Sequence, residues 1–262
     1  MLEIFIYSLI VSILFTPFGV FFTKNQHKNL YLYTKQLIFG LIVLSFLAIL
    51  FNFFYSLNVY INSIIIILFL IIFIKYIKLY LDVNFVIFLL VISFFIAFLI
   101  TESNVYRPDA GLYHLPFIGI LNSEKIIIGL SNLHSRYGLA SIIQHLSAFS
   151  NNIILDNNGI VFPAALLAAT VTVNFIYQIH TYNKSKIYNF HFFYLLFVLI
   201  YIFYKMNRYA EYGNDAPAHF LVFFLISEII LHKNKIKITE FLNHLALSFF
   251  IIQNKPTLII AI

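Results

Sequence analysis

The chain has 262 residues, of which 62% are hydrophobic and only 10% are charged. Because soluble chains carry roughly a quarter charged residues, this composition excludes a soluble enzyme, a disordered regulator and a nucleic-acid-binding domain. The sequence contains no cysteine, which excludes thiolate catalysis, cysteine-ligated metal sites and disulfide bonds. We therefore expect an all-α fold, a polytopic transmembrane helical bundle.

Eight apolar stretches are candidates for membrane spans, because a spanning helix needs about 20 mostly apolar residues. In chain order they are Ile4–Phe22, Leu37–Leu57, Val59–Ile74, Val83–Ile100, Ile160–Ile176, Phe190–Tyr204, Ala218–Leu231 and Phe241–Ile262. The third, sixth and seventh stretches are short. The chain stops inside the last one, so we expect residues 1–262 to be a single transmembrane domain that is truncated at its C-terminus.

Basic residues are distributed unequally when the connecting segments are assigned alternately to the two faces. The loops on one side hold ten lysines, whereas the opposite loops hold five basic residues. The positive-inside rule then places the lysine-rich side in the cytoplasm and the N-terminus outside. All three arginines and most acidic residues fall on the outer side. We therefore expect any polar site at the outer face.

The longest segment between spans, residues 101–158, holds most of the unusual polar residues and should carry the candidate site. We expect two amphipathic interfacial helices in it, both lying in the plane of the membrane. One is Gly111–Leu121, just after Pro108-Asp109. In the other, Leu139, Ile142, Ile143 and Leu146 form an apolar face opposite Ser141, Gln144, His145 and Ser147.

Asp109 and His114 are the candidate catalytic residues of this loop. As a helix N-cap, the Asp109 carboxylate would accept backbone N–H bonds. At the boundary between water and lipid, it would instead act as a general base toward a hydroxyl or as a metal ligand, and both roles can hold together. His114 is either a packed aromatic beside Tyr113 or a partner of Asp109 in a metal or proton-transfer site.

Five further residues are candidate substrate or phosphate contacts. An arginine fork and a histidine suit a phosphate group, as at His134 and Arg136, although Arg136 can instead extend to lipid headgroups. Arg208 and Asp215 in the next outer loop can complete the same site, with an N-cap as the alternative role for Asp215. Lys255 interrupts the last apolar stretch and would add another phosphate contact beneath the outer loops.

Two motifs carry a resemblance to known proteins. Asp109-x-Gly-Leu-Tyr-His114-Leu and Gly129-Leu-x-Asn-Leu-His134-x-Arg136 resemble outer-loop motifs of a poorly characterised family of bacterial polytopic integral membrane proteins. That family distantly resembles the GT-C glycosyltransferases, whose outer-loop acidic residue serves an inverting transfer from a polyprenyl-phosphate-linked sugar. Here the acidic loop follows the fourth candidate span, whereas the principal acidic loop of GT-C enzymes follows the first.

The resemblance implies a role for each matching residue. Asp109 would be the base or metal ligand, and Arg136, His134 and Arg208 would hold the lipid phosphate. Any cofactor would be a divalent cation, Mg²⁺ or Mn²⁺, bound by Asp109.

We therefore expect a membrane glycosyltransferase at the periplasmic face of the bacterial cytoplasmic (inner) membrane, acting on cell-envelope glycans. Its partners would be a polyprenyl-phosphate-sugar donor, a glycan or protein acceptor and membrane lipids, with no nucleic acid. Two alternatives remain open. One is an envelope-polysaccharide polymerase or ligase of another fold, and the other is a transporter or lipid flippase.

Overall fold

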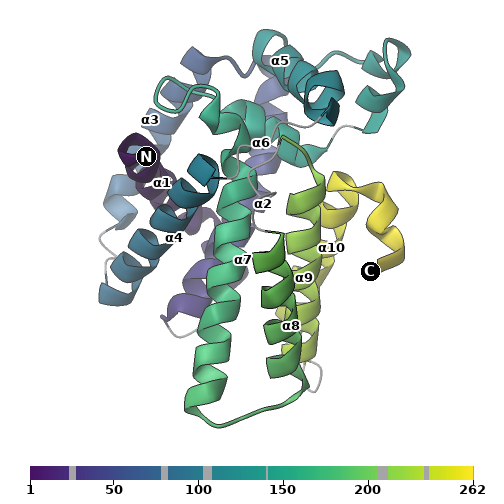
Figure 1. Ribbon diagram of the computed structural model, residues 1–262. Helices are drawn as coiled ribbons and strands as arrows, with labels where there is room; N and C mark the ends of the chain where they lie inside the picture. Colours follow the sequence, from purple (N-terminus) through teal and green to yellow (C-terminus); the bar gives the residue numbers. More distant parts are fainter. Residues whose placement is uncertain are drawn as a thin grey trace.

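The computed structural model describes most of the chain. The described residues are 1–23, 28–77, 82–102, 108–139, 141–205, 212–232 and 236–261. Within these ranges most residues are helical and none lies in a β-strand. The all-α bundle predicted from the composition is therefore confirmed (Figure 1).

Ten α-helices follow one another in the described part of the chain, some of them joined by short 3₁₀ turns. In chain order they are α1 Leu2–Phe15, α2 Leu30–Phe54, α3 Val59–Ile77, α4 Val83–Glu102, α5 Leu115–Ser123, α6 Ile142–Ser150, α7 Asn158–Lys184, α8 Phe190–Tyr204, α9 Asp215–His232 and α10 Ile238–Asn254.

Several of these helices match the predicted spans. Among the described residues, five helical segments are long and apolar enough to cross a membrane: Leu2–Thr23, Leu30–Phe54, Val83–Glu102, Asn158–Lys184 and Asp215–His232. Val59–Ile71 and Phe190–Tyr204 are shorter apolar helices. Their length and composition are those of a multi-pass membrane protein.

The eighth predicted span, Phe241–Ile262, is wrong. Helix α10 ends at Asn254, and Lys255 turns to an extended conformation with φ −148° and ψ 91°. Proline disfavours a helical conformation in the residue before it and lacks the N–H that an α-helix needs, so Pro256 stops the helix here. The residues Pro256–Ala261 form a separate 3₁₀ turn.

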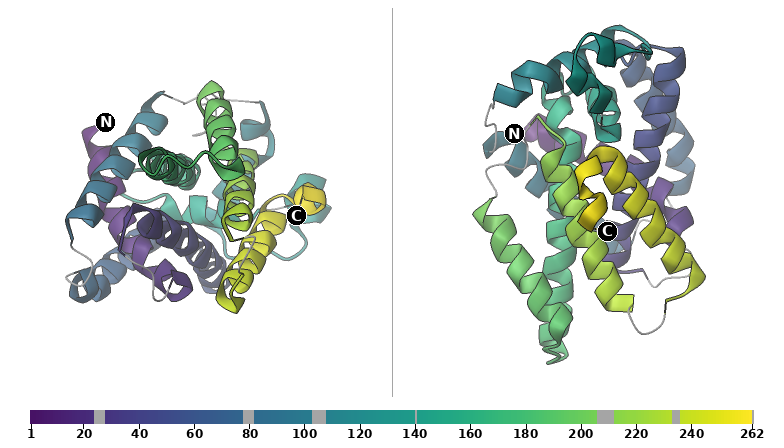
Figure 2. Two further views of the ribbon diagram at one scale, coloured as in Figure 1. Left: turned by 90° about the horizontal axis from the view of Figure 1, so that it is seen from below. Right: turned by 90° about the vertical axis from the view of Figure 1, so that its right-hand side faces the viewer.

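Helix α7 is the central helix of the bundle. It packs against α2, α4, α8 and α9 along its length and against α6 near its N-terminal end (Figures 1 and 2). Four alanines of α7 are completely or almost completely buried, namely Ala164, Ala165, Ala168 and Ala169. Small side chains allow helix backbones to approach closely in membrane bundles, which suits α7 to this position.

Helix α6 is present, but it does not lie at a surface as its amphipathic pattern predicted. It starts at Ile142 rather than Leu139, and all its residues are buried between α2, α5 and α7. The Ser141 hydroxyl donates to Asn254 and the Gln144 amide contacts His114, so both side chains bond to protein groups. The side chains of Ser141 and Gln144 form a capping box at its start.

The other predicted interfacial helix is only half-buried. Its first part, Ala110–His114, is a π-helical turn, and α5 follows directly. Phe117, Ile118 and Leu121 are buried, whereas Pro116 and Gly119 are exposed. The helix therefore covers one end of the bundle (Figure 1), and its buried apolar residues form its inner face.

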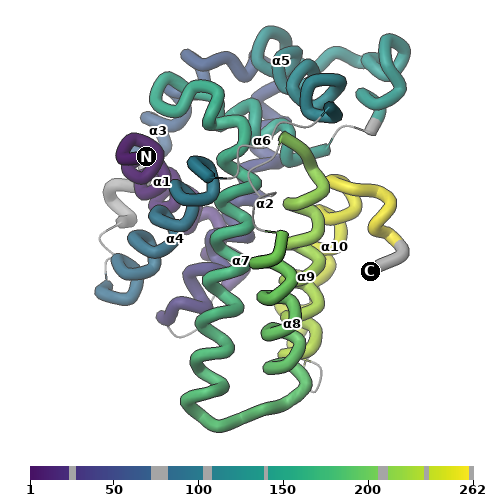
Figure 3. The backbone as a smooth tube through the Cα atoms, viewed as in Figure 1, coloured from purple at the N-terminus to yellow at the C-terminus, as the bar shows by residue number. Residues whose placement is uncertain are grey.

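Helices α9 and α10 connect the two ends of the bundle. They pack against each other and run in opposite directions, as the backbone tube in Figure 3 shows. The start of α9 and the end of α10 consequently lie together near α5 and α6. The end of α9 and the start of α10 lie at the opposite end.

Candidate functional site

A cavity of about 350 Å³ opens where α5, α6, the start of α9 and the end of α10 meet. We call it the polar pocket. Its lining residues are Asp109, Tyr113, His114, Phe117, Arg136, Tyr137, Gln144, Asn214, Asp215, Lys255, Pro256 and Thr257. They come from segments that are far apart in the sequence.

The π-helical turn Ala110–His114 presents the first group of these side chains. A π-turn bonds each carbonyl to the N–H five residues later, and such turns often occur at functional sites. Here Asp109 and His114, five residues apart, both reach the polar pocket. The Asp109 side chain makes no capping bond. The N-cap interpretation of Asp109 is therefore wrong, and its carboxylate faces the pocket.

Tyr113 lies close to two charged side chains of the pocket, those of Asp109 and Arg136. The guanidinium carbon of Arg136 lies 5.2 Å from the centroid of its ring, a cation–π contact. Burial raises the pKa of Tyr113, and the Asp109 carboxylate raises it further. Tyr113 therefore stays a neutral hydroxyl near the Asp109 carboxylate.

His114 is held in one tautomer by Gln144. The Gln144 carbonyl oxygen accepts from the backbone N–H of Ser141 at 3.1 Å, so its amide nitrogen faces His114 Nδ1 at 2.7 Å. Because an amide nitrogen only donates, Nδ1 accepts and the proton lies on Nε2. Burial lowers the pKa of His114, while the nearby Asp215 and Asp109 charges oppose this shift. The ring is thus a neutral N–H donor.

Arg136 belongs to a short segment of turns that starts at Gly129. The backbone φ of Gly129 is 89°, a left-handed conformation that glycine adopts without strain. Arg136 is exposed, and its backbone N–H donates to His134 Nδ1 at 3.2 Å. The guanidinium is therefore presented at the mouth of the pocket with its polar edge accessible.

Lys255 and Asp215 form an ion pair on the far side of the pocket. The distance from Lys255 Nζ to Asp215 Oδ1 is 2.8 Å. The Asp215 side chain is 71% exposed and that of Lys255 is 25% exposed, so water weakens the attraction between them. Lys255 can therefore exchange this partner for an anionic ligand. Asp215 is the first residue of α9.

Asn254 connects the elements that surround the pocket. Its side-chain oxygen accepts from Ser141 Oγ at 2.5 Å and from the Ile143 backbone N–H at 2.9 Å. Its backbone oxygen accepts from the side chain of Asn214 at 2.8 Å. One fully buried residue thus joins the end of α10 to the start of α6 and the start of α9.

The structure brings together five of the seven predicted site residues: Asp109, His114, Arg136, Asp215 and Lys255. His134 is not among the described residues that line the pocket. It is exposed, and its ring packs 5.4 Å from that of Tyr137. Arg208 lies outside the residues that the structure describes.

The sequence interpretation did not assign roles to Tyr113, Gln144, Asn214 or Asn254. Tyr113 lies inside the first motif, and Gln144 lies on the polar side of the amphipathic helix. Asn254 directly precedes Lys255 at the interruption of the last apolar stretch. Their positions were visible in the sequence, but their partners lie too far away in the chain for spacing to identify them.

Comparison with known proteins gives one match. Residues 1–262 match the family described as Domain of unknown function (DUF8201). The chain belongs to this family. No curated protein and no solved structure gives a significant match. The expectation of an uncharacterised family is therefore confirmed, and the resemblance to GT-C enzymes remains a prediction.

The DUF8201 chain has a second hollow beside the polar pocket. It measures about 280 Å³, and we call it the apolar groove. Its lining residues are Ile49, Phe117, Leu121, Ile126, Ile127, Gly129, Leu130, Ser131, Tyr137, Gly138 and His145. Phe117 and Tyr137 line both hollows, with ring centroids 5.8 Å apart, so the two hollows share a wall.

The charges of the polar pocket balance one another. Two carboxylates, of Asp109 and Asp215, face two cations, of Arg136 and Lys255. A Mg²⁺ or Mn²⁺ site needs an excess of carboxylate and carbonyl oxygens. This set of side chains does not fit the predicted divalent cation.

Proposed function

We propose that this DUF8201 protein is a glycosyltransferase that uses a polyprenyl-phosphate-linked sugar donor. The observation that carries the proposal is the shared wall between the polar pocket and the apolar groove. A lipid-linked donor needs an apolar surface for its chain, cations for its phosphate and a base for the acceptor hydroxyl. The apolar groove offers the apolar surface, and the polar pocket offers the cations and the base. Phe117 and Tyr137 lie between the two hollows.

The phosphate would be held by Arg136 and Lys255. The Arg136 guanidinium stacks on Tyr113, and its N–H fork, which makes no hydrogen bond to the described residues, would donate to two phosphate oxygens. Lys255 leaves its exposed partner Asp215 to contact the same group. Both cations would stabilise the negative charge that develops on the leaving phosphate.

Asp109 would act as the general base. The acceptor oxygen attacks the anomeric carbon of the sugar as its proton passes to the Asp109 carboxylate. The bond from that carbon to the phosphate oxygen breaks, and its electron pair leaves with the lipid phosphate. Neutral His114 would offer an N–H donor to the bound substrate rather than a second base.

The proposal is tested by Asp109→Asn, which keeps the shape of the side chain and removes the base. We expect transfer of labelled sugar into envelope glycans to fall at least ~100-fold, because general base catalysis contributes about that much. Glu124→Gln is the matched control, since Glu124 is exposed in the same region and outside the pocket. Full transfer by Asp109→Asn at normal protein level would exclude this function.

We further propose that the pocket end faces the periplasm of a bacterial cytoplasmic membrane. The support is the lysine excess in the loops of the opposite end. The absence of native cysteine allows a direct test. Ser135→Cys should react with a membrane-impermeant maleimide in intact cells, whereas Ser185→Cys should not. The reverse pattern would place the pocket on the cytoplasmic side and exclude a periplasmic donor.

A transporter or flippase is the second candidate, and one observation favours it. Lys35 and Glu228 form a completely buried ion pair within α2 and α9, and charges inside spans often mark transport pathways. The pair lies only about 6–8 Å from the helix ends, at 1.5 Å per residue, and not at mid-membrane. A transporter would tolerate Asp109→Asn, so the same variant distinguishes transport from sugar transfer.

A polymerase or ligase of another fold would use the same pocket and differ in its product.

A further inference from the structure

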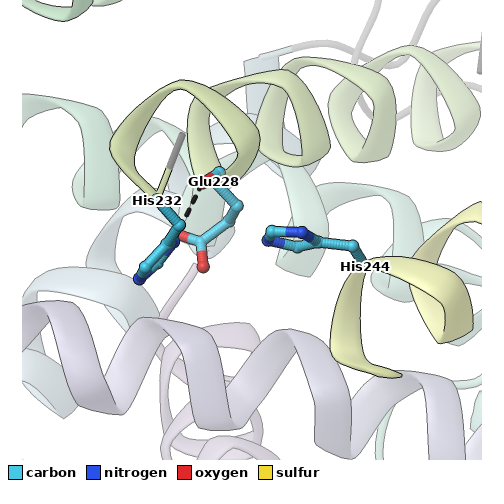
Figure 4. Close-up of side chains that lie close together, drawn as sticks. All are labelled: Glu228, His232 and His244. Atoms are coloured by element: carbon cyan, nitrogen blue, oxygen red, sulfur yellow. Dashed lines mark hydrogen bonds between the residues drawn. The ribbon is translucent and has the colours of Figure 1, made fainter. Parts of the chain in front are cut away.

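The end of the bundle opposite the polar pocket carries a second group of polar side chains that the proposed transfer reaction does not use. Glu228 and His232 lie at the end of α9, and His244 lies in the second turn of α10. Each offers a ligand atom within 4.8 Å of the other two. Figure 4 shows the carboxylate of Glu228 between the two imidazole rings.

Among the described residues, His244 has a buried nitrogen without a hydrogen-bond partner. The residue is only 8% exposed, and its Nε2 makes no hydrogen bond among the described residues. Its ring points toward Glu228 in Figure 4. Nearly all buried polar atoms in proteins are paired, so this nitrogen needs a partner that the described residues do not supply. A metal ion is one such partner.

His232 has an oxygen beside each of its ring nitrogens. Nδ1 lies 2.9 Å from the backbone oxygen of Glu228, and Nε2 lies 3.5 Å from Glu240 Oε1. A metal-binding histidine typically donates its second N–H to a carbonyl or carboxylate oxygen, which fixes the ring. Whichever nitrogen of His232 binds an ion, the other one already has such an acceptor.

The charges around Glu228 leave room for a cation. Tyr31 donates to Oε1 at 2.6 Å and Lys35 pairs with Oε2, but a carboxylate has about four acceptor positions. Lys35 repels a second cation, whereas Glu240 adds a second negative charge beside His232. The carboxylates of Glu228 and Glu240 would thus balance the positive charges of Lys35 and the ion.

From these contacts we propose that Glu228, His232 and His244 bind a divalent transition-metal ion. Two imidazoles and one carboxylate are a typical ligand set for Zn²⁺. The side chains of His232 and Glu240 are 18% and 15% exposed, which gives the ion a path from solvent. The bound ion would join the end of α9 to the start of α10. It is independent of the proposed sugar transfer.

The test uses the full chain, purified in detergent with a tag that contains no histidine and stripped with a chelator. Zn²⁺ is then titrated in competition with a fluorescent zinc indicator, and bound zinc is counted by mass spectrometry. We expect one zinc per chain and a higher melting temperature with Zn²⁺. Mg²⁺ should leave the melting temperature unchanged, because imidazole ligands do not suit it.

His244→Ala should weaken zinc binding at least ~10-fold, since it removes a ligand rather than an outer partner. His180→Ala is the matched control, because His180 is exposed on α7 and lies outside the cluster. Wild-type protein that binds no stoichiometric zinc would overturn the proposal without any variant. Unchanged zinc binding by a folded His244→Ala would overturn it as well.

Discussion

Gln144 donates its side-chain amide to Nδ1 of His114 across 2.7 Å, which connects the buried helix α6 to the turn that carries Asp109. The amide cannot rotate freely, because its oxygen is held by the backbone N–H of Ser141. The capping box of α6 therefore also sets the tautomer of a pocket histidine. A local folding signal and a feature of the candidate site depend on the same side chain.

Arg136 should decide whether the pocket distinguishes a lipid phosphate from the uncharged lipid alcohol. We expect Arg136→Ala to weaken undecaprenyl phosphate binding ~10-fold or more, the effect of losing hydrogen bonds to a charged group. Arg136→Lys should recover only part of it, because lysine lacks the planar fork. Native mass spectrometry of the detergent-solubilised protein measures the binding of undecaprenyl phosphate and of undecaprenol to each variant.

Lys125→Ala is the control for Arg136, since Lys125 is exposed in the same region and outside the pocket. Its binding of undecaprenyl phosphate should equal that of the wild type. If Arg136→Ala binds the phosphate and the alcohol as the wild type does, Arg136 contacts lipid headgroups and not the donor.

Asn254 should be essential for the stability of the pocket end. In Asn254→Ala, the Ser141 hydroxyl and the Ile143 N–H lose their partner inside the protein. An unpaired buried polar group costs about 1–3 kcal/mol, so the melting temperature should fall clearly in a thermal-unfolding assay. Gln253→Ala, at the exposed neighbouring position, should change it little. Equal melting temperatures for the two variants would show that this connection does not stabilise the fold.

Most of the transmembrane architecture could be predicted from hydropathy, because a helix is the structure that satisfies backbone groups in an apolar environment. The last span could not be predicted in this way. Phe241–Ile262 is apolar on both sides of Lys255, and only the backbone restriction imposed by Pro256 decides that the helix ends at Asn254.

The candidate site could be predicted in its residues but not in its connections. The pattern of α6 showed that Gln144 and Ser141 need polar partners, yet water, lipid headgroups and protein groups satisfy that need equally well. Their partners include His114 and Asn254, the latter 113 residues from Ser141. His134 and Arg136 looked equivalent in the motif, and only the direction of the turn places Arg136 alone at the pocket.

Two glycines offer a matched test of how closely α6 and α7 pack. A Cβ at Gly159 would lie 2.0 Å from the backbone oxygen of Ser150, whereas a Cβ at Gly119 would have no neighbour within 4 Å. We expect Gly159→Ala to destabilise the protein by about 1–3 kcal/mol, as overpacking does. Gly119→Ala should be neutral or slightly stabilising, because alanine favours a helix. Thermal unfolding compares them, and equal stability would show that α6 can move away from α7.

His145 should make the stability of the protein depend on pH. Burial in α6 lowers the pKa of His145 from 6.5 to about 4. Because the folded-state pKa lies below the unfolded one, the unfolded state binds the proton more readily. The stability due to the neutral ring is therefore complete above pH 6.5 and is lost as the pH falls toward 4.

Melting temperatures measured between pH 7.5 and pH 4 test this dependence on His145. We expect His145→Leu to lose less stability on acidification than the wild type, since leucine fills the site beside Phe117 without a titrating group. His180→Leu, at an exposed position of α7, should keep the slope of the wild type. If His145→Leu and the wild type lose the same stability over this range, folding does not lower the pKa of His145, and the acid sensitivity of the protein arises elsewhere.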